Sequence, residues 1–222
     1  MKKYIVIVAG GQGTRMSGTL PKQFITLAGK PILQHTLELF DDNYYDIVLV
    51  MNPEFVDFWK DLVHQQSIAV KHKIIAGGST RAESVKNGVM SLEKNSLVAV
   101  HDAVRPFVTS DLLEKLFVSA SNTGSACPII ELKDTLREIT ANSSMTVPRS
   151  NYRAVQTPQV FQTEKLQTAF SLPNFEEYTD EASLYQAAGN SVTLVKGEEQ
   201  NIKITVPNDL LFAEAYLKAK TV

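Results

Sequence analysis

Short apolar runs rich in β-branched residues recur along this chain, and they limit how it can fold more than any other feature. Each run is only a few residues long, and the first one ends directly at glycines. Runs that are apolar throughout, without polar alternation, are typical of strands buried on both faces of a sheet. The runs lie at residues 4–8, 46–50, 73–75, 97–100 and 126–130.

Segments with helical periodicity lie between these runs. Residues 31–40 place their apolar side chains on one face, and Pro31 suits the first helical position. Thr80 to Glu83 has the capping-box pattern and predicts a helix that continues through Leu92. Strands that alternate with helices predict a mainly parallel mixed sheet with helices on both faces, so the fold class is α/β. Towards the end of the chain we expect helices at 179–188 and 207–220 and a strand at 191–195.

The stretch from 131 to 156 breaks this rhythm and predicts a protruding β-arm. Residues 135–140 form one extended segment, 141–144 make a polar turn, and a second extended segment follows through Val155. A hairpin alone buries little of its own surface, so we expect the arm to pack on a second subunit. The alternative is a long surface loop over the same subunit. We treat the chain, 1–222, as a single domain that carries this arm.

Composition excludes several classes of protein. The chain has 222 residues and a formal charge of −2, which argues against non-specific binding of nucleic acid. Its one cysteine, Cys127, excludes an intramolecular disulfide and a cysteine-based metal cluster, and its apolar neighbours predict a core position. The first apolar stretch spans about six residues, too short for a signal peptide or a membrane span. We therefore expect a cytoplasmic protein without a membrane partner.

A glycine-rich loop directly follows the first predicted strand. Gly10, Gly11 and Gly13 leave the backbone N–H groups free to approach an anion, with no Cβ in the way. The loop does not end in the Gly-Lys-Ser/Thr of a Walker A motif. It is not the dinucleotide fingerprint either, whose third glycine would fall at Met16. The pattern indicates a phosphate-binding strand–loop; the alternative is a flexible loop with solvated cations.

Two cations follow the glycines. Arg15 can bind two phosphate oxygens at once, and Lys22, whose approach is stiffened by Pro21, supplies a compact point charge. Together they suit the negative charge of a triphosphate that undergoes displacement. This combination predicts a nucleotidyltransferase. The alternatives from other classes are a non-catalytic nucleotide-binding protein and a redox protein with a dinucleotide cofactor.

A second constellation, His101 to Phe107, lies at the carboxyl end of the fourth predicted strand. Ligands of open α/β sheets gather outside that edge. Asp102 is a candidate to hold a divalent cation or a ribose hydroxyl, and Arg105 to hold Asp102 in place or meet a phosphate. The alternative is a local Asp–Arg pair that only closes a turn. We interpret His101 as an oriented neighbour rather than a catalytic base.

Three further charged residues carry less weight in the pattern alone. Asp180 and Glu181 begin a predicted helix, where carboxylates are favourable through the helix dipole alone. Lys203 lies on a short alternating strand over 201–205, on the face opposite Ile202 and Ile204. A lone lysine in that setting is usually solvated.

Taken together, these motifs resemble one known family, the 2-C-methyl-D-erythritol 4-phosphate cytidylyltransferases of the non-mevalonate isoprenoid pathway. The resemblance covers about residues 3–218. The motifs that carry it, in order along the chain, are Ala9-Gly10-Gly11-x-Gly13-x-Arg15-Met16, Pro21-Lys22-Gln23-Phe24, Gly77-Gly78-x-x-Arg81-x-x-Ser84, His101-Asp102-Ala103-x-Arg105-Pro106, Gln156-Thr157-Pro158-Gln159-x-Phe161, Thr179-Asp180-Glu181-Ala182-Ser183 and Asn201-Ile202-Lys203-Ile204-Thr205.

The resemblance implies a Rossmann-like nucleotidyltransferase, Mg²⁺ or another divalent cation as cofactor, and a homodimer formed through the β-arm. It implies CTP and a small sugar-alcohol phosphate as substrates. Arg15 and Lys22 match the family's transition-state stabilisers, and Arg149 and Lys203 match residues that position the substrate phosphate. The implied nucleotide-binding residues are Ala9, Gly10, Gly11, Gly13, Gly78, Ser84, Asp102 and Ala103. The implied substrate contacts are Arg105, Thr157 and Thr179, with Asp102 also at the metal site.

Two positions depart from the family pattern. Ser79 stands where the family often has an acidic residue, and Pro148 precedes Arg149 where better-known members have an aspartate. A sister family, the ribitol-5-phosphate cytidylyltransferases, shares several of these motifs and would make CDP-ribitol. Ser183 favours the erythritol enzymes, because the ribitol enzymes tend to have a cysteine at this position.

Overall fold

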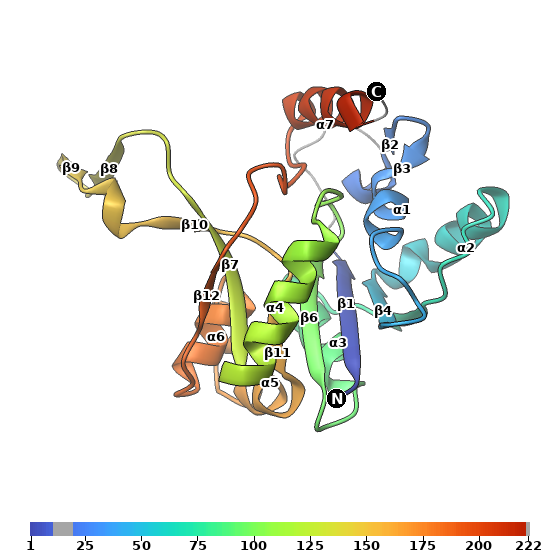
Figure 1. The fold of residues 1–222 in the computed structure, drawn as a ribbon, viewed down its shortest axis with the longest axis horizontal. Helices are drawn as coiled ribbons and strands as arrows, with labels where there is room; N and C mark the ends of the chain where they lie inside the picture. Colours follow the sequence, from blue (N-terminus) through green and yellow to red (C-terminus); the bar gives the residue numbers. More distant parts are fainter. Residues whose placement is uncertain (11–19, 221–222) are drawn as a thin grey trace.

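The computed structural model describes residues 1–10 and 20–220, and a single mixed sheet is its central element (Figure 1). The strand order is β10-β7-β11-β6-β1-β4-β5, and β12 pairs with β7. Four strands of one half run parallel: β1 (Lys3–Ala9), β4 (Asp46–Met51), β5 (Lys73–Ala76) and β6 (Leu97–Asp102). All five apolar runs of the sequence are strands, so the predicted α/β class is confirmed.

The other half of the sheet contains the antiparallel pairs. Strand β11 (Gln159–Gln162) runs antiparallel to both β6 and β7 (Ser125–Glu131), and β10 (Arg153–Val155) is antiparallel to β7. Strand β12 (Leu194–Lys196) returns parallel to β7. Through β10 and β11, the chain re-enters the sheet after the arm, which places the residues between them beside the end of β6.

Helices cover both faces of the sheet, as the alternating pattern predicts. One hydrophobic cluster includes Leu37, Trp59 and Phe117 from helices on one face, and another includes Val85, Leu166 and Tyr185 from helices on the other. Helix α3 lies so close that a Cβ on Gly88 would be 2.7 Å from Val50 and 2.8 Å from Val6. The helices are α1 (Ile32–Leu37), α2 (Val56–Gln65), α3 (Arg81–Met90), α4 (Ser110–Thr123), α5 (Thr163–Ala169), α6 (Glu181–Ala187) and α7 (Pro207–Lys220).

Short elements connect these units. Strands β2 (Thr26–Leu27) and β3 (Lys30–Pro31) pair with each other, and the short 3-10 turns are η1 (Lys22–Phe24), η2 (Pro53–Phe55), η3 (Arg149–Asn151) and η4 (Phe175–Glu177). Cys127 is buried, as predicted. Within 1–10 and 20–220, no helix is long and apolar enough to cross a membrane.

Several predicted boundaries are wrong. Pro31 is not the first helical residue: its ψ of 144° is extended, and α1 begins at Ile32 and ends at Leu37 rather than near residue 40. Helix α3 ends at Met90 instead of Leu92, and the strand expected at 191–195 is β12. Isolated propensity locates such ends poorly because tertiary contacts decide where backbone pairing stops.

The strand expected at 201–205 is absent, because these residues pair with no strand along their length. Ile204 donates one backbone hydrogen bond to Val104, at 2.9 Å, and Ile202 bonds locally to Gln200. Ile204 is nonetheless fully buried, so the alternation correctly predicts which side chain faces the core.

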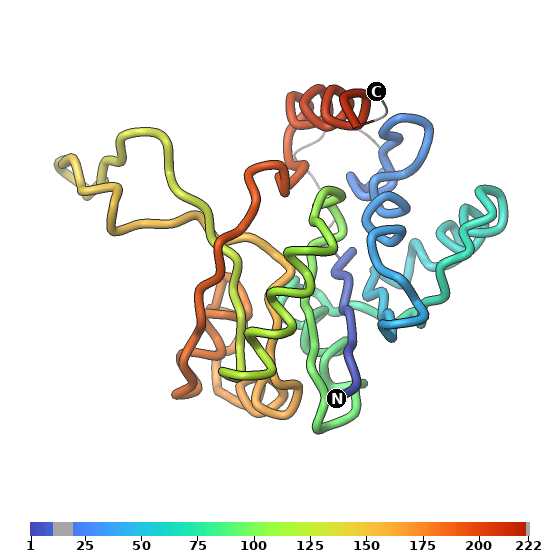
Figure 2. The backbone as a smooth tube through the Cα atoms, viewed as in Figure 1, coloured from blue at the N-terminus to red at the C-terminus, as the bar shows by residue number. Residues whose placement is uncertain are grey.

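The arm extends from one end of the sheet, away from α7 (Figures 1 and 2). Its predicted hairpin is confirmed: β8 (Leu136–Ile139) pairs antiparallel with β9 (Ser144–Val147). The second segment is not extended throughout, because η3 interrupts it. Ile139 is 72% exposed and Met145 is 60% exposed, so the hairpin leaves large apolar side chains uncovered within this chain.

Candidate active site

A small cavity of about 120 Å³ lies at the carboxyl edge of the parallel strands. β1 and β6 both end there, at Ala9 and Asp102, which is the edge where ligands of α/β sheets bind. Four of the charged residues singled out by motif reasoning or by the resemblance meet at this point. The cavity is lined by Val8, Ala9, Lys22, Gln23, Arg81, Asp102, Ala103, Val104 and Lys203.

Asp102 is the centre of this cluster and is only 6% exposed. One carboxylate oxygen lies 3.0 Å from the Lys203 ammonium and 3.3 Å from Nε of Arg105, and the other lies 3.5 Å from Arg81. Burial opposes ionisation of this carboxyl, but the three cations outweigh it and hold the pKa of Asp102 well below its usual range. The carboxylate is therefore charged at neutral pH. Lys203, to which the pattern alone gives little weight, pairs with Asp102.

His101 and Thr157 support Asp102 from behind. The Asp102 N–H donates to the Thr157 hydroxyl at 3.1 Å, and that hydroxyl lies 3.1 Å from Nδ1 of His101. Nε2 of His101 lies 3.0 Å from the Arg105 carbonyl, which can only accept a hydrogen bond. Nε2 therefore carries the proton and Nδ1 accepts from Thr157. Burial lowers the pKa of His101 to about 4, so the ring is neutral at pH 7. His101 is an oriented neighbour, as the sequence indicates.

Arg105 is almost buried and fully engaged in the site. It contacts Asp102, and its Nη1 donates to the Asn201 carbonyl at 2.9 Å. Burial lowers the pKa of Arg105, although the nearby Asp102 charge opposes that effect. The local Asp–Arg pair considered from the sequence exists, and Arg105 additionally connects it to the segment that carries Lys203.

Sequence reasoning missed the pair formed by Arg81 and Glu181. The guanidinium donates to both oxygens of Glu181, at 2.7 and 3.0 Å, in the bidentate geometry that favours arginine. Burial alone would lower the pKa of Arg81, but Glu181 and Asp102 raise it. The alternative that Glu181 acts through the helix dipole alone is therefore excluded. Both residues stand in the motifs, at the first turns of α3 and α6, but their contact spans 100 positions.

Three of the residues predicted to bind the nucleotide, Gly10, Gly78 and Ser84, lie close together. Ser84 accepts from the Gly78 N–H at 3.1 Å, and a Cβ on Gly10 would lie 2.6 Å from the Ser84 oxygen. Glycine is therefore required at position 10 by close approach. At the first departure from the family pattern, Ser79 donates from its N–H and its hydroxyl to the Glu83 carboxylate, each at 2.6 Å. Thr80 caps α3 through the Glu83 N–H.

Lys22 reaches the cavity on a short turn that is tied to β1. Gln23, a buried residue that sequence reasoning did not assign, donates from its side-chain amide to the Ala9 carbonyl at 2.9 Å. This bond fixes the Lys22 turn against the end of the first strand. Gly11, Gly13 and Arg15 lie outside the described residues.

Besides Arg105 and Thr157, which lie behind Asp102, two more of the predicted substrate residues do not line the cavity. Arg149 is exposed on the arm and donates to the Lys133 carbonyl. Thr179 is exposed and directly precedes Asp180, whose carboxylate caps α6 by accepting from the Ser183 N–H at 3.0 Å. Asp180 is therefore a capping residue, which agrees with its predicted place at the start of a helix.

Three cations and one carboxylate line the cavity, so its charge balance favours an anion. Within residues 1–10 and 20–220, no three acidic, histidine or cysteine side chains gather into a metal cage, and Asp102 is the one carboxylate that lines the cavity. Mg²⁺ is commonly bound by one or two carboxylates together with substrate phosphates and water. The single Asp102 carboxylate fits such an arrangement.

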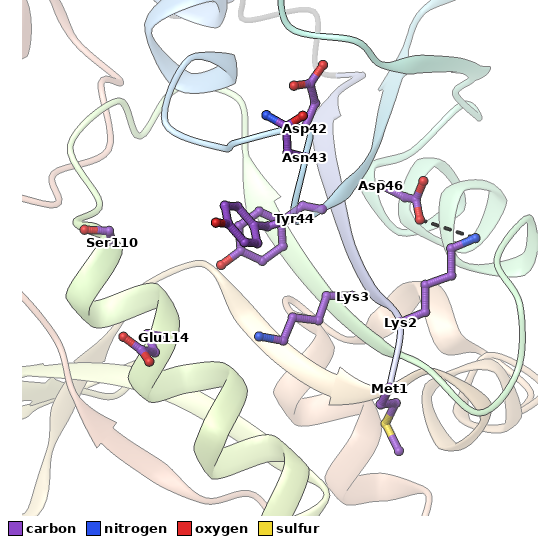
Figure 3. A pocket seen from close by; sticks show the side chains of 10 residues that line it. Met1, Lys2, Lys3, Asp42, Asn43, Tyr44, Asp46, Ser110 and Glu114 are labelled. Carbon is purple, nitrogen blue, oxygen red and sulfur yellow. Dashed lines mark ion pairs between the residues drawn. The ribbon is translucent and has the colours of Figure 1, made fainter.

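A larger surface hollow of about 600 Å³ lies at the opposite edge of the sheet, near the start of β1 (Figure 3). Its lining includes Lys2, Lys3 and Glu114, and Lys2 pairs with Asp46 at 3.3 Å. Lys2 and Glu114 are exposed, and the hollow is remote from the carboxyl edge. The smaller cavity, where a buried carboxylate meets several cations at the carboxyl edge of the sheet, is therefore the candidate active site.

A mixed sheet with a cationic site at its carboxyl edge defines this protein as an α/β nucleotidyltransferase. The chain belongs to the 2-C-methyl-D-erythritol 4-phosphate cytidylyltransferases, whose profile matches residues 4–219. It is 44% identical over 219 residues to the enzyme of that name from Bacteroides thetaiotaomicron, covering 98% of this chain and 100% of the relative. The relative from Halalkalibacterium halodurans is 41% identical over 225 residues, with 99% of each chain covered.

Solved structures agree with this membership. The enzyme from Thermus thermophilus superimposes with a TM-score of 0.79 at 30% identity, covering 98% of this chain and 100% of its own. The 4-diphosphocytidyl-2C-methyl-D-erythritol synthase of Anaerococcus prevotii gives 0.81 at 28% identity, over 98% and 96% of the two chains. The predicted Rossmann-like nucleotidyltransferase fold and the family resemblance are confirmed.

The neutral, buried His101 predicts how stability responds to acid. Between its ordinary pKa of 6.5 and about 4, the unfolded chain gains a proton on this histidine that the folded protein does not accept. The folded state therefore loses stability as pH falls through that window, by roughly 1–3 kcal/mol from this residue. Urea unfolding at pH 7, 6 and 5 should give a shallower pH dependence for His101→Gln than for wild type. Parallel curves for the two proteins would contradict the assignment.

Proposed function

We propose that this enzyme joins CTP and 2-C-methyl-D-erythritol 4-phosphate to give 4-diphosphocytidyl-2-C-methyl-D-erythritol and pyrophosphate. The observation that supports this most directly is one cavity at the carboxyl edge, lined by Lys22 and by Arg81 and Lys203, which both pair with a charged Asp102. Three cations at one edge suit the meeting of two phosphorylated substrates. Family membership supports the identity of the pyrimidine and of the alcohol.

The reaction is an in-line displacement at phosphorus. An oxygen of the substrate phosphate attacks the α-phosphorus of CTP, and the bond from that phosphorus to the β-phosphate oxygen breaks to release pyrophosphate. A phosphomonoester has a second pKa near ~6, so the nucleophile is already largely ionised at neutral pH. No general base is required, which agrees with the buried, hydrogen-bonded position of the nearby His101.

Catalysis then consists of holding two anions together and neutralising charge as it develops. Lys22 and Arg15 are assigned to the triphosphate, and Lys203 to the substrate phosphate. The Lys203 ammonium lies 3.0 Å from the Asp102 carboxylate, and this ion pair holds it at the carboxyl edge of the sheet. Arg105 lies behind Asp102 and holds it, so its proposed role moves from direct substrate contact to support of the site.

Mg²⁺ is proposed as the cofactor, with Asp102 as its protein ligand. When bound, the ion supplies further neutralisation of phosphate charge. Asp102 is held by the Thr157 hydroxyl through its own N–H and by Arg105 through its carboxylate, so its position is fixed.

A homodimer formed through the β-arm is proposed to complete the site. Arg149 is exposed on the arm, and it does not line the cavity of its own chain. The exposed Ile139 and Met145 on the arm hairpin need a partner surface to bury them. An arm that reaches a second subunit would bring Arg149 to the substrate phosphate there.

Comparing turnover of methylerythritol phosphate with turnover of ribitol phosphate tests the proposed activity against that of the ribitol-5-phosphate cytidylyltransferases. The purified protein should release pyrophosphate from CTP and Mg²⁺ with methylerythritol phosphate. With ribitol phosphate, we expect a rate lower by at least roughly 10²-fold, since sites built on hydrogen bonds to one alcohol reject another strongly. Faster turnover of ribitol phosphate would replace the proposed substrate, and no pyrophosphate with either alcohol would refute the transferase assignment.

Removing single cations should lower the rate while the fold is retained. We expect Lys22→Ala and Arg15→Ala each to lower kcat by roughly 10²–10³-fold, the usual effect of losing one preorganised charge in a dry site. Lys60→Ala is a matched control, because Lys60 is an exposed lysine paired with Asp57. Steady-state pyrophosphate release and thermal unfolding measure the two properties. Near-normal turnover of either site variant would overturn its assigned role.

A shared site predicts complementation between inactive chains. Arg149→Ala and Lys22→Ala proteins should each be inactive, but mixing them allows heterodimers in which one site has both residues. After subunit exchange, we expect about a quarter of wild-type activity from a random mixture, because half of the dimers contain one intact site. Exchange is followed separately with differently tagged chains. Complete exchange without recovered activity would exclude a site built from two subunits.

A further inference from the structure

Gln156 is a buried glutamine that the proposed chemistry does not use. It follows β10 at the base of the arm and is 3% exposed. Its side-chain oxygen accepts from the Glu198 N–H at 3.1 Å, and its side-chain nitrogen donates to the Glu198 carbonyl at 2.7 Å. The same nitrogen lies 3.2 Å from the Asn201 carbonyl. The amide thus pairs with both backbone groups of Glu198, as a neighbouring strand would.

The segment held in this way is the one that carries Lys203. After Gly197, whose N–H still bonds to β7, the chain leaves the sheet, so the backbone of 198–203 lacks the ladder that a strand would provide. Other bonds support it locally: the Asn201 side chain donates to the Thr157 carbonyl at 2.8 Å, and Thr109 donates to the Glu198 carboxylate. Backbone groups buried without partners are costly, and the Gln156 amide supplies partners at two places in the segment.

The Asn201 carbonyl connects Gln156 to the charged cluster. It accepts from Gln156 and, at 2.9 Å, from Nη1 of Arg105, whose Nε lies 3.3 Å from Asp102. Two residues further along, the Lys203 ammonium meets the same Asp102 at 3.0 Å. The position of Lys203 therefore depends on a backbone that Gln156 and Arg105 fix together.

We propose that Gln156 is a positioning residue for Lys203. Its amide replaces the missing strand partner of 198–201, and it thereby holds the Lys203 ammonium against Asp102. Gln156 does not line the cavity, so it acts through the backbone and not on the reacting groups. The effect on turnover rests on the proposed function, whereas the effect on Lys203 does not.

Gln167 provides a matched control. It is also a buried glutamine, and its side-chain nitrogen donates to the carbonyls of Val89 and Leu92 at 3.0 and 3.1 Å. These bonds lie at the carboxyl end of α3, whereas Arg81 enters the site from its first turn. Gln156→Met and Gln167→Met each remove one buried amide with little change in shape. If the Gln156 amide only stabilised the fold, the two variants should lose the same stability and have the same kinetics.

The first measurement is the accessibility of Lys203 itself. Trace acetylation with acetic anhydride, read by mass spectrometry, gives the labelling of Lys203 relative to the exposed Lys60. We expect this ratio to rise several-fold in Gln156→Met and to stay at the wild-type value in Gln167→Met. Gln156→Glu is a second variant. It retains the oxygen that accepts from Glu198, but it replaces the nitrogen that donates to the Glu198 and Asn201 carbonyls with an oxygen that cannot donate. It should therefore also raise the ratio. Unchanged labelling in both Gln156 variants overturns the proposal, whatever their rates.

The second measurement is the division between kcat and KM. With wild-type turnover established, Gln156→Met should lower kcat by roughly 10–100-fold, as expected for a misplaced charge, while KM for CTP changes less than about threefold. Gln167→Met should keep the wild-type kcat. Equal kcat for the two variants overturns the catalytic part of the proposal. A wild-type protein without turnover would instead refute the proposed function, and the labelling comparison would still decide the role of Gln156.

Discussion

The charge on Asp102 cannot stay buried alone, and this requirement organises the whole carboxyl edge. Removing a carboxylate from water costs several kcal/mol unless partners compensate for it. Here the partners are three cations that arrive from different parts of the chain: α3, the turn after β6 and the segment after β12. Satisfying one buried ion therefore fixes three segments at once, and the excess positive charge that remains is available to a phosphate.

The sequence predicts the frame of this site because the frame is encoded locally. Runs such as 4–8 and 97–100 are apolar throughout, and burial on both faces allows nothing else in the centre of a parallel sheet. Their order along the chain then places Gly10, directly after β1, and Asp102, at the end of β6, at the same edge. The contacts of Arg81 are different, because it reaches Asp102 across 21 positions and Glu181 across 100, and no periodicity records such contacts.

The segment 201–205 shows where a local pattern reaches its limit. Alternation of Ile202, Lys203 and Ile204 predicts a strand, and the division of faces is correct: Ile204 is buried, while Lys203 turns to the Asp102 carboxylate. What alternation cannot predict is the partner of the backbone. The backbone is held by the Gln156 amide and by isolated hydrogen bonds. The residues therefore alternate as in a strand, but they have no continuous hydrogen-bonded pairing with another strand.

A second glutamine extends the same principle to the other side of the site. Gln159, three positions after Gln156, donates to the Asp180 carboxylate at 2.8 Å and accepts from the Ala182 N–H at 2.9 Å. It thereby fixes the first turn of α6, from which Glu181 holds Arg81. The two amides flank Thr157, whose hydroxyl supports Asp102 through its N–H. One short segment at the base of the arm therefore sets the positions of Asp102, of Lys203 and of the carboxylate behind Arg81, so a displacement of the arm's base would move all three together.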